Sequence, residues 1–370
     1  MNILILTNND SGLIQLRKEL LEALVKKHQV VCCTPDENGY IDMIKQLGCG
    51  CVVFNFNRRG INPIEDLRII RTYKKIIADT EADVVLTYTI KPNVYGGFAC
   101  QQLGIPYLSN ITGLGTTIEN GGLLCKISLF MYKMGLRKSN CVFFQNAANQ
   151  KFFVDKGIAK GVTRLLPGSG VNIDHHRLEG YPPDGKTFNF LFIGRLMKDK
   201  GIGELLTAIA RLKQDGMNVF LDIVGGYDED YSDLLKKYEA DGVVKYHGQQ
   251  ENVHDYYAQA HCVVLPSYHE GMANVLLEAA ATGRPVIASR VPGCMETFDE
   301  GSTGLGCEAK DVMSLQDAMK RMCKMSWETR RTMGLSGREK IVKEFSRQII
   351  IDRYFEQIYL IEKNRNMTKK

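Results

Sequence analysis

Short apolar runs alternate with amphipathic stretches along most of this chain, and that alternation constrains its fold more than any other feature. In the first half the apolar runs are the predicted strands 3–6, 30–33, 52–56, 84–88, 107–111 and 141–145. Amphipathic stretches such as 14–27 and 63–80 lie between them. Strands that alternate with helices favour a parallel sheet covered by helices on both faces. The sequence therefore predicts an α/β, doubly wound architecture.

The alternation pauses once, at residues 165–186, which are rich in Pro, Gly and Asp. Such stretches interrupt regular structure, and 370 residues are too many for one compact core. The pattern then resumes with predicted strands 188–193, 219–224, 243–247, 262–265 and 285–288. We expect two Rossmann-like domains, 1–170 and 171–347, facing a central cleft, with ligands beyond the carboxyl ends of their strands. Residues 348–370 are expected to form a helix that returns toward the first domain, plus a basic tail.

Composition excludes several classes of protein. The chain is 44% apolar and 24% charged, as in globular proteins, and no apolar run reaches the roughly 18 residues of a transmembrane helix. The start MNILILTNND lacks the basic region of a signal peptide. Eleven cysteines without a CxxC spacing indicate free thiols in a reducing cytoplasm. The missing GxGxxG fingerprint argues against a nicotinamide dehydrogenase, and the lack of an aromatic-basic motif argues against nucleic-acid binding.

Charge is uneven along the chain. Residues 1–170 carry 20 Lys/Arg and 13 Asp/Glu, a net charge of +7, whereas the remainder has a net charge of −2. A basic first half beside a slightly acidic second half indicates that the first domain meets an anionic surface.

Two acids eight positions apart, Glu270 and Glu278, occupy the stretch PSYHEGMANVLLEAAATGRPVIAS. We expect a helix to begin at Gly271, Met272, Ala273 and Asn274, with unsatisfied amides that attract phosphate. An ionised carboxylate only accepts hydrogen bonds, so it suits sugar hydroxyls. Together these groups indicate a nucleotide-sugar site. The alternative is a helix whose acids compensate its dipole.

Two further motifs follow predicted strands. In GRLMKDKG, residues 194–201, Arg195 and Lys200 suit a pyrophosphate group; a solvated basic turn is the alternative. The loop 8–12 ends at Gly12, which lets a backbone approach a phosphate closely. Its alternative is a simple turn in which Ser11 caps the next helix.

Arg195 and Lys200, spaced as GRx4KG, are followed some 70 residues later by the Ex7E pair, and this combination resembles the retaining family 4 glycosyltransferases of the GT-B fold. The resemblance covers essentially the whole chain. It implies that Arg195 and Lys200 bind the donor diphosphate, that Glu270 faces the donor sugar and that Glu278 faces the ribose. It also implies that Gly12 supports the phosphate from the other domain and that the peptide around Gly248 meets the base.

One departure from the family concerns the acceptor side. Many relatives carry a His in the first domain, but here the only one is His28, far from any strand-end motif. The polar groups available instead lie in YTIKPNVYGG and NITGLGTT, namely Lys91, Asn93, Thr112 and Gly113, with Leu114 and Gly115 beyond them. Lys91 is interpreted either as a contact for an acceptor phosphate or as an ordinary surface lysine.

The acidic run Asp228-Glu229-Asp230 is similar to the DxD metal motif of other glycosyltransferases. Because Arg195 and Lys200 already supply positive charge in the GT-B pattern, a solvated loop is the preferred interpretation. We expect neither a metal nor another cofactor, since the remaining acids show no ligand spacing.

A basic amphipathic helix is predicted over residues 121–138. Lys126, Lys133 and Arg137 share one face of it, and apolar side chains occupy much of the rest. Such a helix can lie on an anionic membrane surface. The alternative is a core helix with a basic outer stripe.

The sequence thus predicts a retaining, metal-independent glycosyltransferase in which Arg195, Lys200 and Glu270 carry the chemistry. Its donor would be a nucleoside-diphosphate sugar, UDP-linked, and its acceptor a polyprenyl-diphosphate-linked or other glycan in bacterial capsule, O-antigen or lipid-linked glycan assembly. We expect a monomer or homodimer, peripheral at the cytoplasmic face of the membrane. A nucleotide-sugar 2-epimerase, a phosphorylase or a non-catalytic sugar-nucleotide-binding protein are the alternatives.

Overall fold

The computed structural model describes residues 1–57, 62–113 and 122–368, and the chain divides into two compact units. The first unit combines Met1–Ser169 with Gln348–Lys370, and the second is Gly170–Arg347. Each unit holds one sheet in which every strand pairs in parallel, so the predicted α/β fold class is confirmed. Among the described residues no helix is long and apolar enough to span a bilayer.

The first unit is built on a seven-stranded sheet with the order β3-β2-β1-β4-β5-β6-β7. Its strands are β1 (Asn2–Leu6), β2 (Gln29–Thr34), β3 (Gly50–Val53), β4 (Val84–Tyr88), β5 (Tyr107–Ile111), β6 (Cys141–Phe144) and β7 (Thr163–Leu165). Its helices include α1 (Asp10–Val25), α2 (Ile41–Gln46), α3 (Pro63–Asp79), α4 (Gly97–Leu103), α6 (Gly122–Gly135), α7 (Ala147–Asp155) and α14 (Arg347–Thr368). A π-helical turn, Pro92–Gly96, leads into α4.

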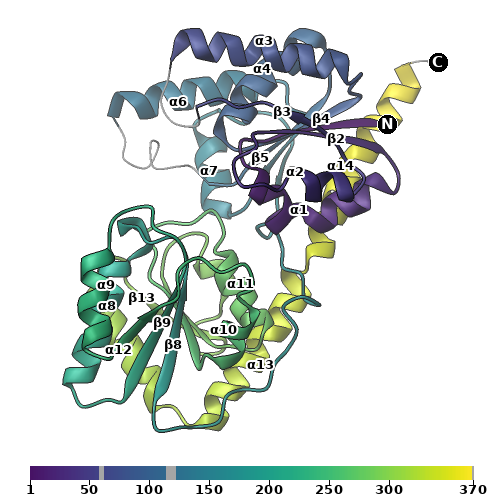
Figure 1. The fold of residues 1–370 in the computed structure, drawn as a ribbon. Helices are drawn as coiled ribbons and strands as arrows, with labels where there is room; N and C mark the ends of the chain where they lie inside the picture. Colours follow the sequence, from purple (N-terminus) through teal and green to yellow (C-terminus); the bar gives the residue numbers. More distant parts are fainter. Residues whose placement is uncertain (58–61, 114–121, 369–370) are drawn as a thin grey trace. The chain divides into compact units, whose positions relative to one another are not determined.

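Helices cover both faces of this sheet, and β1 shows why. Side chains of a strand point alternately to its two faces. Ile3 and Ile5 accordingly pack in the core beneath α1 and α14, whereas Leu4 and Leu6 pack in the core beneath α3 and α4. Figure 1 shows α3, α4 and α6 on one face and α1 with α14 on the other. A strand with apolar side chains on both faces, as in residues 3–6, therefore needs helices on both sides.

The second unit has a six-stranded sheet with the order β10-β9-β8-β11-β12-β13. Its strands are β8 (Phe188–Ile193), β9 (Val219–Val224), β10 (Val244–Tyr246), β11 (Cys262–Leu265), β12 (Val286–Ser289) and β13 (Gly304–Cys307). Its helices include α8 (Ile202–Gln214), α9 (Ser232–Ala240), α10 (His254–Gln259), α11 (Asn274–Ala281), α12 (Val312–Lys324) and α13 (Trp327–Glu344). In Figure 1, α8, α9 and α12 lie on one face and α10, α11 and α13 on the other.

The C-terminal helix α14 belongs to the first unit for most of its length. Ile350, Tyr354 and Ile358 are buried in the core that also contains β1. The side-chain amide of Asn110 on β5 donates to the hydroxyl of Tyr354, and Arg365 pairs with Asp83. Apolar packing, a hydrogen bond and an ion pair therefore hold this helix on the sheet.

Several predicted strand ends shift by one residue, and three larger differences separate the predicted strands from the observed ones. The run predicted as strand 52–56 pairs with β2 only over Gly50–Val53, and the amide of Phe54 adds one hydrogen bond to the carbonyl of Thr34. Phe54 and Phe56 pack against Tyr73 of α3. The short strands β7 and β13 were not predicted. Both lie at a sheet edge and lack a long apolar run, so their strand character depends on the neighbour with which they pair.

Candidate active site

Two loops at the carboxyl edge of the second sheet bring Lys200 and Glu270 together. Lys200 ends the 3₁₀ turn Lys198–Lys200 after β8, and Glu270 follows β11, which is the neighbour of β8. The Lys200 ammonium contacts the Glu270 carboxylate, and the Ser267 hydroxyl donates to the same carboxylate oxygen at 2.8 Å. The two side chains are only 20% and 12% exposed. The residue predicted to bind the diphosphate, Lys200, and the residue predicted to face the sugar, Glu270, thus form an ion pair with each other.

Gly201 allows this approach. Its φ of +69° is a left-handed conformation, and a Cβ there would lie 2.2 Å from the carbonyl oxygen of Pro266. The amide of Tyr268 also donates to the carbonyl of Asp199 at 2.8 Å. Backbone contacts therefore fix the spacing of the two loops, and a side chain at position 201 would separate them.

Arg195, the other predicted diphosphate ligand, lies on the same edge but is open to solvent. Its side chain is 62% exposed, and its guanidinium pairs with Asp228 at 3.0 Å. The next two residues of the acidic run also make local contacts. Glu229 accepts from the amide of Lys198 at 2.9 Å, and Asp230 accepts from Ser232 at the start of α9. The run thus holds the Arg195 and Lys198 loop in place.

The predicted start of the helix that carries Glu278 is wrong by three residues. Gly271, Met272 and Ala273 precede α11, which begins at Asn274. The amide of Ala273 donates to the carbonyl of Gly293 at 2.8 Å, and that of Asn274 donates to the carbonyl of Met272. These two amides are therefore already bonded inside the protein, that of Ala273 by the turn at Gly293 and that of Asn274 within its own loop.

Glu278 is in the second turn of α11, in a poorly solvated position. Its carboxylate accepts a hydrogen bond from the hydroxyl of the fully buried Tyr257 at 2.8 Å. Burial raises the pKa of Glu278 to about 7, although the Tyr257 hydrogen bond and the positive charge of Arg347 act in the opposite direction. A carboxyl with this pKa changes its charge near neutral pH.

Gly248, predicted to meet the base, lies just beyond β10 on the same edge of the sheet. Its φ is +68°, and its carbonyl accepts from the amide of Gly225 at 2.8 Å. The imidazole of the preceding His247 lies 2.7 Å from the carboxylate of Asp222 on β9. The loops after β8, β10 and β11 therefore place Arg195, Gly248 and Glu270 along one edge, as a parallel sheet requires.

Gly12 does not end a loop as predicted. Helix α1 begins at Asp10, so Gly12 lies in its first turn, and Ser11 does not cap it, since the N-cap is Asn9. Sequence reasoning missed Asp10, which is fully buried and accepts hydrogen bonds from the backbone and side chain of Asn38. Burial acts to raise the pKa of Asp10, but the bonds from Asn38 and Ser11 outweigh it and lower the pKa. Asp10 thereby starts the helix and ties it to the loop after β2.

Lys91 is not the surface lysine of the alternative interpretation. It is 6% exposed, and its ammonium lies 3.5 Å from the carboxylate of Asp66 on α3. It follows Thr89, whose φ of +72° is unusual for a β-branched residue, and it directly precedes the π-helical turn. Strained backbone and π-helical turns are frequent at functional sites. A direct contact between Lys91 and an acceptor phosphate would require the Asp66 pair to open.

Asn93 is buried in the first unit, and both polar atoms of its side chain are hydrogen-bonded there. Its amide oxygen accepts from Thr87 at 2.6 Å and its amide nitrogen donates to the carbonyl of Asn110 at 2.8 Å. The acceptor contact predicted for Asn93 therefore does not fit its position, because both ends of the amide join β4 and β5. Thr112 and Gly113 follow β5 and are half-buried. Leu114 and Gly115 lie outside the described residues.

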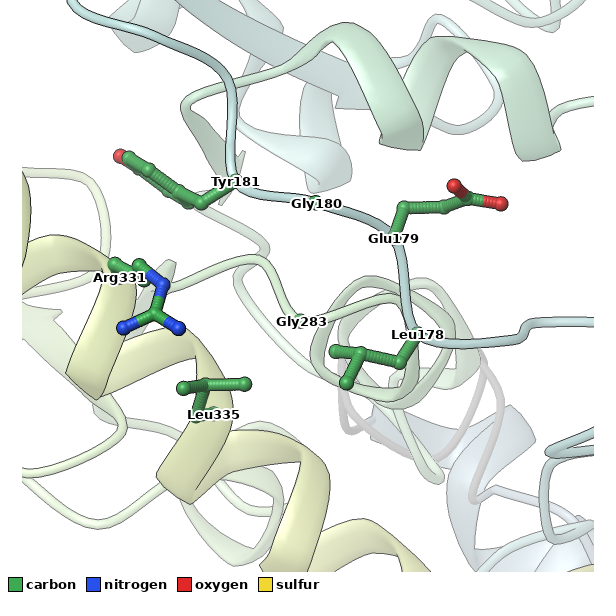
Figure 2. A pocket seen from close by; sticks show the side chains of 7 residues that line it. All are labelled: Leu178, Glu179, Gly180, Tyr181, Gly283, Arg331 and Leu335. Atoms are coloured by element: carbon green, nitrogen blue, oxygen red, sulfur yellow. The ribbon is translucent and has the colours of Figure 1, made fainter.

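One hollow of about 220 Å³ lies at the opposite edge of the second sheet. Figure 2 shows Arg331 and Leu335 of α13 pointing toward Gly283 and the segment Leu178–Tyr181. Gly283 comes shortly before β12, so it lies at the amino edge, whereas Glu270 follows β11 at the carboxyl edge. This hollow is therefore separate from the candidate site.

Comparisons with known proteins match each half of the chain to a glycosyltransferase family model. The family model "Glycosyl transferase 4-like" matches residues 2–146, and "Glycosyl transferases group 1" matches residues 178–340. The chain belongs to these glycosyltransferases, which have the GT-B fold. The resemblance predicted from the Arg195, Lys200, Glu270 and Glu278 motifs is thereby confirmed.

This glycosyltransferase is similar in sequence to two bacterial relatives. It is 25% identical to the N,N'-diacetylbacillosaminyl-diphospho-undecaprenol alpha-1,3-N-acetylgalactosaminyltransferase of Campylobacter jejuni, with 86% of this chain and 88% of the relative covered. It is 30% identical to the capsular polysaccharide biosynthesis glycosyltransferase CapM of Staphylococcus aureus over 48% of each chain.

Solved structures agree on the fold of the glycosyltransferase. Sucrose-phosphate synthase from Thermosynechococcus elongatus matches with a TM-score of 0.80 and 22% identity, covering 97% of this chain and 99% of that one. Anabaena HepE, solved in complex with UDP, matches with a TM-score of 0.80 and 18% identity, covering 97% and 100%.

Proposed function

We propose that this glycosyltransferase moves a hexosyl or N-acetylhexosaminyl unit from a UDP-sugar to a polyprenyl-diphosphate-linked saccharide, with retention of anomeric configuration. The observation behind the proposal is the Lys200–Glu270 pair, with Arg195 on the same edge of the second sheet. Two cations beside a carboxylate suit a diphosphate and a sugar bound next to each other. The Campylobacter relative, which acts on an undecaprenyl-diphosphate acceptor, and the UDP complex of HepE support the choice of substrates.

The chemistry assigned to the site is stabilisation of the leaving group. Arg195 and Lys200 neutralise the charge that develops on UDP as the bond between the anomeric carbon and the phosphate oxygen breaks. The acceptor hydroxyl attacks the same face of the sugar and gives its proton to a phosphate oxygen, so that a glycosidic bond and UDP result. Glu270 orients the sugar hydroxyls, and Glu278 the ribose. Because the two side chains supply the positive charge, the reaction needs no metal.

The same proposal gives the enzyme a place in the cell. A polyprenyl-diphosphate acceptor is anchored in a bilayer, so we place the enzyme peripherally at the cytoplasmic face of the membrane. We expect it to act as a monomer or homodimer. Its products would serve bacterial surface polysaccharide or lipid-linked glycan assembly. The names of the two relatives, a diphospho-undecaprenol transferase of C. jejuni and a capsular polysaccharide enzyme of S. aureus, support this assignment.

The test is a transfer assay with purified protein, a panel of UDP- and GDP-sugars and a polyprenyl-diphosphate-linked saccharide. We expect UDP release that depends on the acceptor, an unchanged rate in the presence of a chelator, and a product whose anomeric coupling in NMR matches that of the donor. An inverted product contradicts retention. Conversion of the donor without acceptor identifies a 2-epimerase, and donor binding without turnover identifies a binding protein.

A further inference from the structure

The Glu270 carboxylate is held at one of its two oxygens by two different groups. The hydroxyl of Ser267 donates to Oε1 of Glu270 at 2.8 Å, and the ammonium of Lys200 contacts the same atom. Ser267 belongs to the loop after β11, as Glu270 does, whereas Lys200 comes from the loop after β8. Hydrogen-bond donors prefer to lie near the plane of a carboxyl group. Two donors at one oxygen therefore fix the orientation of the whole carboxylate.

The Ser267 side chain is fully buried, so a ligand in the site does not touch it. A serine in a turn commonly bonds a backbone group close to it in the chain. The Ser267 hydroxyl bonds the Glu270 carboxylate instead, and it makes no other hydrogen bond in the part of the chain that the structure describes. Its one donor thus acts on a side chain of the candidate site.

Backbone contacts hold the loop that carries both residues. A Cβ on Gly293 would lie 2.5 Å from the carbonyl oxygen of Glu270, so the two segments are already in close contact. The amide of Tyr268, which lies between Ser267 and Glu270, donates to the carbonyl of Asp199 at 2.8 Å. The side-chain torsions of Glu270 are therefore what remains to be set, and the Ser267 hydroxyl restrains them.

Lys200 and Ser267 differ in what they can do when a donor binds. An ammonium carries three donors on a flexible four-carbon stem, so Lys200 can turn toward a diphosphate. In the proposed function it does so, and its contact with Glu270 weakens. The hydroxyl of Ser267 has a single donor on a short, buried side chain, and it cannot follow. Ser267 is therefore the contact that stays on Glu270 after the donor has bound.

We propose that Ser267 is a positioning residue for the donor sugar. It keeps the Glu270 carboxylate oriented toward the sugar hydroxyls while Lys200 binds the diphosphate, and it touches neither part of the donor itself. This inference rests on the proposed function and deepens it, because it separates recognition of the sugar from recognition of the nucleotide. Loss of the Ser267 hydroxyl acts on the sugar end of the donor and leaves binding of the nucleotide end unchanged.

The test measures Ser267→Ala by calorimetric titration and by turnover in the full chain. The two ligands are UDP and the UDP-sugar that the unchanged protein turns over fastest in the transfer assay. We expect the variant to bind UDP as the unchanged protein does, which also shows that the second unit is folded. Its kcat/KM for the UDP-sugar should fall about 10- to 100-fold, the effect of one hydrogen bond to a charged group. Ser267→Cys keeps a weaker donor of similar size and should fall between the two.

Ser289→Ala is the matched control. It removes an equally buried hydroxyl from the end of the neighbouring strand β12, and Ser289 bonds neither Lys200 nor Glu270, so UDP binding and turnover should stay unchanged. Unchanged kcat/KM in Ser267→Ala would overturn the proposal. A parallel loss of UDP and UDP-sugar affinity would also overturn it, since Ser267 would then support the site as a whole. The proposed function fails by a different result, namely no turnover of any UDP-sugar by the unchanged protein, and this inference then falls with it.

Discussion

The Lys200 ammonium contacts the Glu270 carboxylate, although 70 residues separate the two in the chain. Each side chain is mostly shielded from water, so each satisfies the charge of the other in the absence of a substrate. A donor diphosphate that binds Lys200 must share this ammonium with Glu270. The pair therefore holds Lys200 in a defined position before the donor arrives, which lowers the cost of ordering it in the transition state.

Loss of the Lys200 charge should reduce turnover strongly. We expect Lys200→Ala to lower kcat about 10² to 10³-fold, as removal of one charge-stabilising donor does elsewhere. Lys198→Ala is the matched control, because Lys198 lies in the same 3₁₀ turn, is exposed and does not contact Glu270. Donor consumption in the presence of acceptor measures both. Equal losses in the two variants would remove Lys200 from the mechanism.

A side chain at position 201 should disturb the same site through the backbone. Gly201→Ala places a Cβ 2.2 Å from the Pro266 carbonyl at a φ of +69°, so we expect a loss of more than about 1 kcal/mol in stability and a lower kcat. Gly203→Ala in α8 meets nothing within 4 Å and should raise the unfolding temperature slightly, because Ala favours helices by about 1 kcal/mol. Thermal unfolding and turnover of both variants test this contrast; similar behaviour would contradict it.

Glu278 should make stability depend on pH below neutrality. Its pKa is about 7 in the folded protein and 4.5 ordinarily, so folding takes up a proton between these values. Stability should therefore fall as the pH rises from about 4.5 to 7, by up to about 3 kcal/mol from this group. Glu278→Gln should show a shallower slope in unfolding temperature across this window.

Tyr257→Phe tests the pKa of Glu278 by removing the hydroxyl that donates a hydrogen bond to it. The variant removes the hydrogen bond that stabilises the charged form, so the pKa of Glu278 should rise further and the sensitive window should extend to higher pH. Slopes identical to the wild type in both variants would show that Glu278 is not the titrating group.

The Lys91–Asp66 pair should matter for stability because it is buried. Lys91→Met leaves the Asp66 carboxylate without its cation, which we expect to cost about 3–5 kcal/mol, and addition of Asp66→Asn should restore part of it. Lys18→Ala in the exposed Lys18–Glu22 pair should cost less than about 1 kcal/mol. Denaturant unfolding measures all three. A double variant as unstable as Lys91→Met would argue against an electrostatic cause.

The anchoring of α14 can be tested with two adjacent residues. Ile358 is 1% exposed in the core of the first unit, whereas Tyr359 is 62% exposed. We expect Ile358→Ala to lower the free energy of unfolding by about 2–5 kcal/mol and Tyr359→Ala to change it by less than about 0.5 kcal/mol. Comparable losses would show that α14 is not held by its buried face.

Much of the fold was predictable from local pattern. The mostly apolar runs at 84–88, 107–111, 188–193, 219–224 and 262–265 are strands at those residues, because a strand buried on both faces is nearly continuously apolar. The edge strands β7 and β13 were not predictable, since their residues do not form such runs. The start of α11 at Asn274 was also missed, because the carbonyl of Gly293, a distant residue, bonds the amide of Ala273.

The sequence by itself determined the α/β class, the family, and the placement of Arg195, Lys200, Glu270 and Gly248 after strands of one domain, because periodicity and motif spacing are local properties. Tertiary structure decided which of these groups meet. The adjacency of β8 and β11 brings Lys200 to Glu270, and the packing of α3 buries Lys91 against Asp66. Burial of the Glu278 carboxyl raises its pKa against the opposing effects of Tyr257 and Arg347. Contacts and burial arise between segments distant in the chain. They determine which charged side chains are paired with each other and which can bind a ligand.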